Sequence, residues 1–197
     1  MSRAVLYIDG ENLRHYVEEV LREKNIPEKD AILLNIDLLK LLNKILKGIK
    51  VSKKIYYSAK LKLHKETIRK SKELIQKQRV LKTKLEKQGF DFVMSGNVRL
   101  QRIVVNKKSK IVFKEKGVDV KIAVDLVSTA CDKKVKTAII CSSDSDLQPA
   151  ITEIKNRGVK VIYLGFEIKP NRGLMYTTDR TILIRNSEVL EFFNKKK

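Results

Sequence analysis

Along the chain, short apolar runs alternate with longer stretches in which apolar residues recur at helical spacing. The first apolar run, residues 3–8, is rich in β-branched and aromatic side chains, which is typical of a buried strand. Residues 11–24 follow at once and carry apolar residues every three or four positions, as an amphipathic helix does. This strand-then-helix order recurs towards the C-terminus.

The same patterns predict the remaining elements. The predicted strands are residues 3–8, 51–58, 90–94, 98–105, 110–114, 136–141, 159–164 and 181–184. The predicted helices are residues 11–24, 35–46, 62–88, 118–131, 147–157 and 187–193. Asn35 is the expected N-cap of the second helix, and residues 98–105 and 110–114 are expected to form a hairpin.

Alternating strands and helices predict an α/β fold with a mostly parallel central sheet, helices on both faces, and a basic hairpin. We expect a single domain over residues 1–194, with an extra helical insertion at about 25–50 and a basic tail at 195–197. In such sheets a binding site lies beyond the carboxyl ends of the strands, near the point where strand order reverses.

The net charge of the chain indicates which class of partner it binds. The 197-residue chain has 43 Lys and Arg against 23 Asp and Glu, a net charge of +20, which favours a polyanionic partner. The alternative is the solvated, lysine-rich surface of a thermophilic protein. We favour nucleic acid, RNA first and DNA second, because such surfaces usually balance Lys with Glu.

Several classes of protein are disfavoured. Two cysteines without a CxxC pair and two histidines argue against a structural zinc site. No apolar run approaches 18 residues, and the first one ends in Asp9, so neither a membrane span nor a signal peptide is predicted. A reduced, cytoplasmic compartment is the expected location. The sequence leaves open whether the chain forms a homodimer.

Acidic residues follow two of the predicted strands. Asp9 comes directly after the first strand, and Asp144 and Asp146 come after the strand at 136–141, so they can converge if these strands are neighbours. Asp119 opens the helix at 118–131 in phase with its apolar face, which directs it towards the edge of the sheet. The alternative is that Asp144 and Asp146 only cap the next helix.

Four carboxylates gathered at one edge would repel one another, and a divalent cation removes that repulsion. Oxygen ligands of this kind suit Mg²⁺ or Mn²⁺. Such a metal can activate water and stabilise a phosphodiester transition state. Asn12, one turn into the first helix, can add an amide to substrate or to a water. Asp125 lies on the opposite, polar face of its helix with Lys121, so we expect it to be exposed.

Three segments, "YIDGENL", "KGVDVKIAVDLV" and "SSDSDLQPAITEIKNRGVKVIYLG", resemble in order the signature segments of the NYN domain. This is a PIN-like nuclease family that includes the LabA-like bacterial proteins. The resemblance implies a PIN-like α/β fold and metal-dependent RNA cleavage. Two departures are the insertion near 25–50 and Ser145, where the family often has Gly.

The resemblance also implies a set of site residues. Its acidic cluster, both catalytic and metal-binding, falls on Asp9, Asp119, Asp144 and Asp146. Asn12 and Ser142 lie beside that cluster. The family pattern commonly has a further acid at the position of Asp125. We keep Asp125 as a candidate that acts on the site indirectly, through other site residues.

The helix at 62–88 and the hairpin form predicted basic surfaces. No aromatic residue lies between Tyr57 and Phe90, so phosphate contact is favoured over base stacking on this helix. The alternative is a simple solvated helix face. The candidate substrate-binding residues, besides Asn12 and Ser142, are Arg99, Arg102, Lys107, Lys70 and Lys77.

The leading hypothesis is a metal-dependent endoribonuclease that hydrolyses RNA phosphodiester bonds at the four-Asp site. The alternative from another class is a non-catalytic RNA- or DNA-binding regulator that uses the same basic surface. A Toprim-like domain has no place for the Asp119 segment. A phosphatase of the haloacid-dehalogenase type needs Asp-x-Asp after the first strand, and "DGEN" lacks it.

Overall fold

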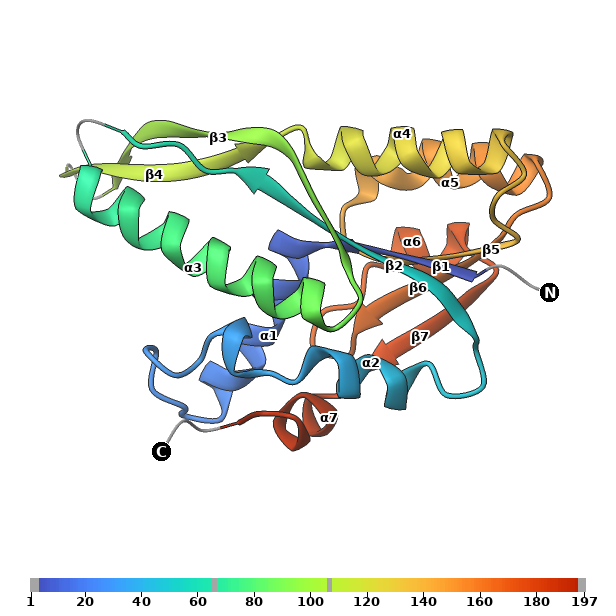
Figure 1. Ribbon diagram of the computed structural model, residues 1–197, viewed down its shortest axis with the longest axis horizontal. Helices are drawn as coiled ribbons and strands as arrows, with labels where there is room; N and C mark the ends of the chain where they lie inside the picture. The colour runs from blue at the N-terminus through green and yellow to red at the C-terminus, as the bar shows by residue number, and fades with distance from the viewer. Residues whose placement is uncertain (1–3, 65–66, 106–107, 195–197) are drawn as a thin grey trace.

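The computed structural model is organised around one seven-stranded sheet with the strand order β4-β3-β2-β1-β5-β6-β7 (Figure 1). It describes residues 4–64, 67–105 and 108–194. The strands are β1 (Ala4–Asp9), β2 (Val51–Lys60), β3 (Asp91–Val105), β4 (Lys108–Lys116), β5 (Thr137–Cys141), β6 (Lys160–Phe166) and β7 (Arg180–Ile184). Every neighbouring pair is parallel except β3 and β4, which form an antiparallel hairpin. The predicted mostly parallel α/β fold is therefore confirmed.

Helices cover both faces of the sheet. They are α1 (Gly10–Glu23), α2 (Leu38–Ile45), α3 (Ile68–Lys87), α4 (Val118–Cys131), α5 (Gln148–Asn156), α6 (Arg172–Thr177) and α7 (Asn186–Glu191), with 3-10 turns η1 (Leu33–Asn35) and η3 (Ser145–Leu147). Side chains of α1, α2 and α7 pack into one core, and those of α4, α5 and α6 pack into the other. Figure 1 shows α3 running beside the hairpin at one end of the molecule.

The central strand β1 belongs to both cores because its side chains alternate across the sheet. All six residues of β1 are buried. Leu6 and Ile8 pack into the α1 side, where they meet Leu13. Tyr7 packs into the α4 side together with Leu126. Burial on both faces explains why the run reads as continuously apolar rather than alternating.

Strand order reverses between β1 and β5. From β1 the chain adds β2, β3 and β4 in one direction, and β5, β6 and β7 extend the sheet in the other. β1 and β5 are parallel neighbours, with Ile8 paired to Cys141. Their carboxyl ends therefore open at the topological switch point, where ligands bind in open α/β sheets.

Two predicted strands, at 90–94 and 98–105, are one continuous strand. The first part of β3 pairs with β2 in parallel, and from Asn97 onward β3 pairs with β4. Gly96 lies at the change of partner with a φ of +66°, and a Cβ there would lie 2.3 Å from the carbonyl oxygen of Lys116. Only glycine fits this backbone conformation and close approach.

Helix boundaries differ from the prediction in three places. Asn35 does not cap α2: it is buried in η1 and donates its amide to the carbonyl of Asp30 at 2.8 Å. Asp37 is the cap and accepts from the backbone N–H of Lys40 at 3.2 Å. The short helix α6 lies in a stretch predicted to be irregular, and α3 starts at Ile68 and not at residue 62 as predicted.

Within residues 4–64, 67–105 and 108–194, no helix is long and apolar enough to cross a membrane. The predicted basic tail at 195–197 lies outside the described part of the chain. The segment at 25–50 contains η1 and α2, which pack into the α1 side of the core. That this segment is an insertion stays a prediction.

Candidate functional site

The tight turn from β1 into α1 places Asp9 at the carboxyl edge of the sheet. α1 begins at Gly10, directly after the strand, so Asp9 is its N-cap. A Cβ at Gly10 would lie 2.5 Å from the ring of Tyr56 and from the carbonyl oxygen of Tyr57. The absence of a side chain at Gly10 therefore lets α1 start against β2, directly after Asp9.

The carboxylate of Asp9 accepts four hydrogen bonds. Oδ1 accepts from the backbone N–H groups of Glu11 and Asn12, both at 3.1 Å. Oδ2 accepts from the Asn12 amide at 2.6 Å and from the Ser142 hydroxyl at 3.1 Å. Asp9 is only 5% exposed. Burial raises the pKa of Asp9, although the hydrogen bonds from Asn12, Ser142 and Glu11 act in the opposite direction.

Ser142 and Asn12 connect the end of β1 to the loop after β5. The backbone N–H of Asp144 donates to the Ser142 hydroxyl at 3.2 Å, while that hydroxyl donates to Asp9. The backbone N–H of Ser143 donates to Oδ1 of Asn12 at 3.4 Å. The structure thus brings the two predicted neighbours of the acidic cluster, Asn12 and Ser142, into direct contact with Asp9.

Three of the four predicted acids form one cluster. One carboxylate oxygen from each of Asp119, Asp144 and Asp146 lies within 4.8 Å of the other two. Asp119 and Asp144 are half-buried, and Asp146 is exposed. They come from the first turn of α4 and from the segment after β5, and α4 packs against η3. Three carboxylate oxygens this close to one another could hold a metal ion.

Asp9 lies beside this three-Asp cluster and is not a member of it. A carboxylate has about four lone-pair sites, and the four donors at Asp9 use them all.

The alternative that these acids cap helices is correct in part. Asp144 is the N-cap of η3 and accepts from the backbone N–H of Asp146 at 3.0 Å. Capping explains the positions of Asp9 and Asp144. It does not explain Asp119, because the N-cap of α4 is Gly117 and Asp119 is nevertheless part of the cluster.

A further acid at the site, Glu115 of β4, was missed in the sequence. Burial raises the pKa of Glu115 to about 7, and the negative charges of Asp9, Glu11 and Asp119 add to the effect. The backbone N–H of Val118 donates to its carboxylate. Glu115 directly precedes the segment "KGVDVKIAVDLV" and lies four residues before Asp119, but it stands in the lysine-rich strand "KSKIVFKEK", which we interpreted as a basic surface.

Asp125 is not the exposed residue that its position on the helical wheel suggested. Its side chain is 23% exposed, and it accepts a hydrogen bond from the Tyr57 hydroxyl of β2 at 2.9 Å. Lys121, one turn earlier, donates to its other oxygen at 2.6 Å. Burial raises the pKa of Tyr57, and the charge of Asp125 adds to this. The contact between Asp125 and Tyr57 therefore connects α4 to the sheet. Asp119 lies in the first turn of the same helix, so this contact helps to position it.

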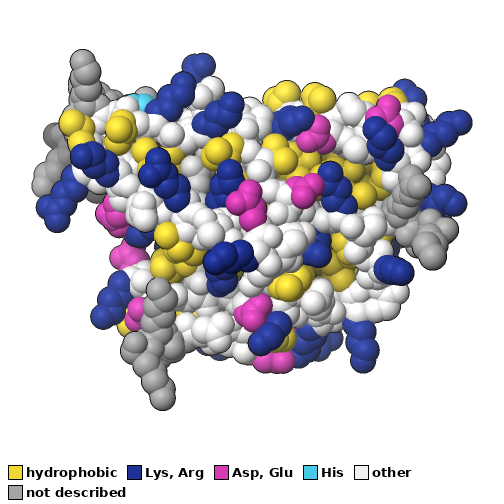
Figure 2. Space-filling model, viewed as in Figure 1, with side chains coloured by type: hydrophobic (Ala, Val, Ile, Leu, Met, Phe, Trp, Pro, Cys, Tyr) yellow, Lys and Arg dark blue, Asp and Glu magenta, His cyan; other side chains and the backbone are white. Residues whose placement is uncertain are grey.

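The basic residues are spread widely. Figure 2 shows Lys and Arg side chains across the whole face in view, with Asp and Glu between them. Arg99 on β3 and Lys70 and Lys77 on α3 are exposed. Lys107 and the side chain of Arg102 lie outside the described part of the structure.

Comparison with known proteins agrees with these motifs and with this fold. A family model described as the NYN domain matches residues 3–185. A crystal structure of a protein of unknown function from Vibrio parahaemolyticus superposes with a TM-score of 0.61. The two chains share 18% sequence identity over 93% of each, so the likeness bears on the fold alone. No curated protein matches the sequence.

Proposed function

This chain belongs to the NYN domain family, and we propose that it is a metal-dependent endoribonuclease that hydrolyses RNA phosphodiester bonds. The family is nuclease-like, which supports a nucleic-acid substrate and hydrolysis. The single observation that carries the proposal is the cluster of Asp119, Asp144 and Asp146, with carboxylate oxygens within 4.8 Å of one another. Binding of RNA phosphates alone would not require acids at this position.

Asp119, Asp144 and Asp146 would hold Mg²⁺ or Mn²⁺. When bound there, the cation would supply Lewis-acid stabilisation of the charge that develops on a phosphodiester under attack. Asp9 can join the three ligands only if one of its four donors leaves. Two of the four donors, the Asn12 amide and the Ser142 hydroxyl, are on side chains that can rotate, and we assign the opening of Asp9 to these two.

Basic residues would position the RNA backbone. Arg99, Lys70 and Lys77 are exposed on the hairpin and on α3, and we assign them to phosphate contacts together with Arg102 and Lys107. Ser142 is held by Asp9 and by the backbone of Asp144, so its role is to fix the two strand ends. We also propose a cytoplasmic location, which rests on the free thiols of Cys131 and Cys141.

The decisive experiment incubates the full chain with single-stranded and structured RNA, with Mn²⁺, with Mg²⁺ and with a chelator. Wild type should cut RNA only with a divalent cation. Asp144→Asn keeps the side-chain volume and removes a ligand charge, so cleavage should fall by orders of magnitude while RNA binding survives. The control is Asp132→Asn, which removes an exposed carboxylate at the far end of α4 and should leave cleavage unchanged.

One observation favours the alternative, a non-catalytic RNA- or DNA-binding regulator. In the structure the hydrogen bonds of Asp9 leave three acids rather than four in the cluster. Folded wild type that binds RNA with the expected salt dependence but cuts no substrate with any metal would establish this alternative. Cleavage that persists in a clean Asp144→Asn preparation would refute the proposed centre.

A further inference from the structure

A long groove runs along the molecule beside the acidic site. Its volume is about 850 Å³, within the ~300–1,000 Å³ of typical ligand sites. Side chains of β2 form its floor, α1 and the loop before η1 form one wall, and α3 and the hairpin form the other. Gln78 of α3 donates to the Ser58 hydroxyl at 2.8 Å and to the carbonyl of Ala59 at 2.7 Å. These two bonds hold α3 at a fixed distance from β2.

One end of the groove reaches the acidic site. Gly10, Glu11 and Glu115 line it there, and Gly10 directly follows Asp9. The negative charges of Asp9 and Asp119 both act on Glu115, so this lining residue is near both acids. A chain that occupied the groove could therefore continue into the site without leaving the protein surface.

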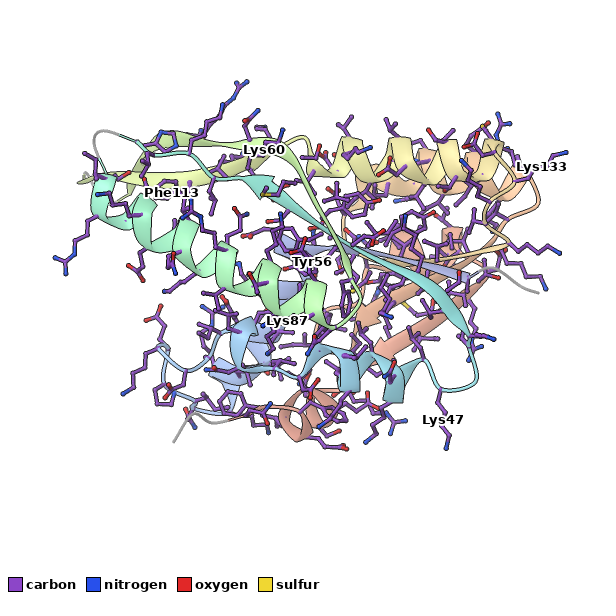
Figure 3. All side chains as sticks on the ribbon, in the orientation of Figure 1. Lys47, Tyr56, Lys60, Lys87, Phe113 and Lys133 are labelled. Carbon is purple, nitrogen blue, oxygen red and sulfur yellow. The ribbon has the colours of Figure 1, made fainter. Side chains whose placement is uncertain are left out.

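The other end is apolar, aromatic and basic. Phe113 of β4 lines the groove, and the Lys70 ammonium lies 5.4 Å from the centre of its ring. Figure 3 shows Phe113 at the hairpin end beside α3 and Tyr56 closer to the middle of the molecule. Leu74, like Lys70 and Lys77, projects from α3 into the lining. Tertiary folding thus supplies the aromatic surface that the sequence of α3 lacks.

We infer that this groove binds the bases of an unpaired nucleic-acid strand and leads that strand to the acidic site. This inference takes its substrate, a nucleic acid, from the proposed function. It adds the place where the strand lies and states that the protein contacts the bases of that strand. The apolar and aromatic lining on the side of α3 and the hairpin matches the faces of bases, and Lys70 and Lys77 match the phosphates between them. The α1 side is charged, and there Arg14 pairs with Glu11 and Glu18. A phosphate-binding surface would not need the apolar floor.

The test compares two strands of equal length and equal charge, one with bases and one abasic, by fluorescence anisotropy in a chelator. Base stacking on a protein is worth ~1–3 kcal/mol per base, so the strand with bases should bind wild type at least about tenfold more tightly. A duplex should bind no better than the abasic strand. Equal affinity for the two single strands would overturn the inference. Cleavage with Mn²⁺ is measured separately, so failure of the groove and failure of the active site are distinguishable.

Two α3 variants give a matched comparison. Leu74→Gln removes apolar surface from the lining without a change of charge, so it should reduce the preference for the strand with bases at least about threefold. Val80→Gln makes a matching apolar-to-polar change at a position that is 47% exposed and outside the lining, and it should keep the preference for bases. An unchanged preference in folded Leu74→Gln would also overturn the inference.

A second pair covers the case in which Leu74→Gln does not fold. Lys70→Gln with Lys77→Gln removes two charges from the rim of the groove. Lys72→Gln with Arg79→Gln removes two exposed charges from the same helix at the same spacing, outside the lining. The rim pair should weaken binding of the strand with bases at least about threefold more than the outer pair. Equal losses would contradict a bound strand in the groove.

Discussion

The hydroxyl of Ser142 donates a hydrogen bond to Oδ2 of Asp9 at 3.1 Å, across the point where the order of the strands reverses. The same hydroxyl accepts from the backbone N–H of Asp144 at 3.2 Å. One small side chain therefore fixes the end of β1 relative to the loop that carries two of the three clustered acids.

Ser142→Ala should destabilise the protein by about 1–3 kcal/mol, because it leaves a buried carboxylate and a backbone N–H with one partner fewer. Urea unfolding at neutral pH measures this loss. Ser145→Ala, at an exposed position in η3, is the control and should change the free energy of unfolding by less than about 0.5 kcal/mol. Equal stability of the two variants would show that the contact contributes nothing.

Glu115→Gln should flatten the dependence of stability on pH. The pKa of Glu115 is raised from 4.5 to about 7 in the folded chain, so the unfolded chain loses this proton first as pH rises. Wild type should therefore lose stability between about pH 4.5 and pH 7 relative to the variant. We expect about 1–2 kcal/mol, allowing for solvent screening of a half-buried group.

Urea unfolding of wild type and Glu115→Gln at pH 5 and pH 8 makes this comparison. The raised pKa of Asp9 acts in the same direction in both proteins, so it largely cancels in the difference between them. Parallel pH profiles would mean that Glu115 ionises normally in the folded state.

Divalent cations should stabilise wild type against heat more than they stabilise Asp144→Asn. A ligand at a hundred times its dissociation constant adds about 2.7 kcal/mol to stability, and loss of a carboxylate ligand weakens binding. Thermal unfolding with and without Mn²⁺ measures the difference, and Asp132→Asn should respond as wild type does. Without metal, Asp144→Asn should be at least as stable as wild type, because repulsion within the three-Asp cluster falls.

Helix α3 should carry much of the salt dependence of RNA binding. Replacement by Gln of four of its basic residues should flatten the slope of log K against log salt by about 0.7 for each phosphate that the protein no longer neutralises. These residues are Lys70, Lys72, Lys77 and Arg79. The control replaces four exposed lysines away from α3, of which Lys47 and Lys133 are marked in Figure 3. The four controls are Lys47, Lys50, Lys133 and Lys136. Equal slopes for the two quadruple variants would make α3 a solvated helix face.

Tyr57→Phe should destabilise the protein by about 1–2 kcal/mol, because it removes the hydroxyl that bonds the half-buried Asp125. It should also lower metal affinity, since α4 carries Asp119 on the same rigid element. Tyr16→Phe is the control: Tyr16 contributes ring stacking on Phe166, which the substitution keeps. A Tyr57→Phe protein with wild-type stability would remove Asp125 from any supporting role.

The sequence predicted those features that follow from local pattern and from the ends of strands. β1 and β5 were recognisable as apolar runs, and the parallel topology then placed Asp9 and Ser142 at one edge. The continuous β3 was not predicted, because Gly96 reads as a break when the change of pairing partner is unknown. Phe113 was missed as a lining residue because only tertiary folding brings the hairpin against α3. Glu115 was missed although it lies four residues before Asp119, because the strand around it is rich in lysine and was interpreted only as a basic surface.

The pairing of β1 with both β2 and β5 has a consequence for synthesis of the chain. Ala4 pairs with Val51 on one side and with Thr137 on the other. Ribosomes add roughly 5–20 residues per second, so β1 waits roughly 7–27 s after its own synthesis for its second neighbour. During that interval one apolar edge of the nascent sheet is unpaired, and it is there that chaperones would act. Ser142 emerges only then, so a new molecule acquires its acidic site late in its translation.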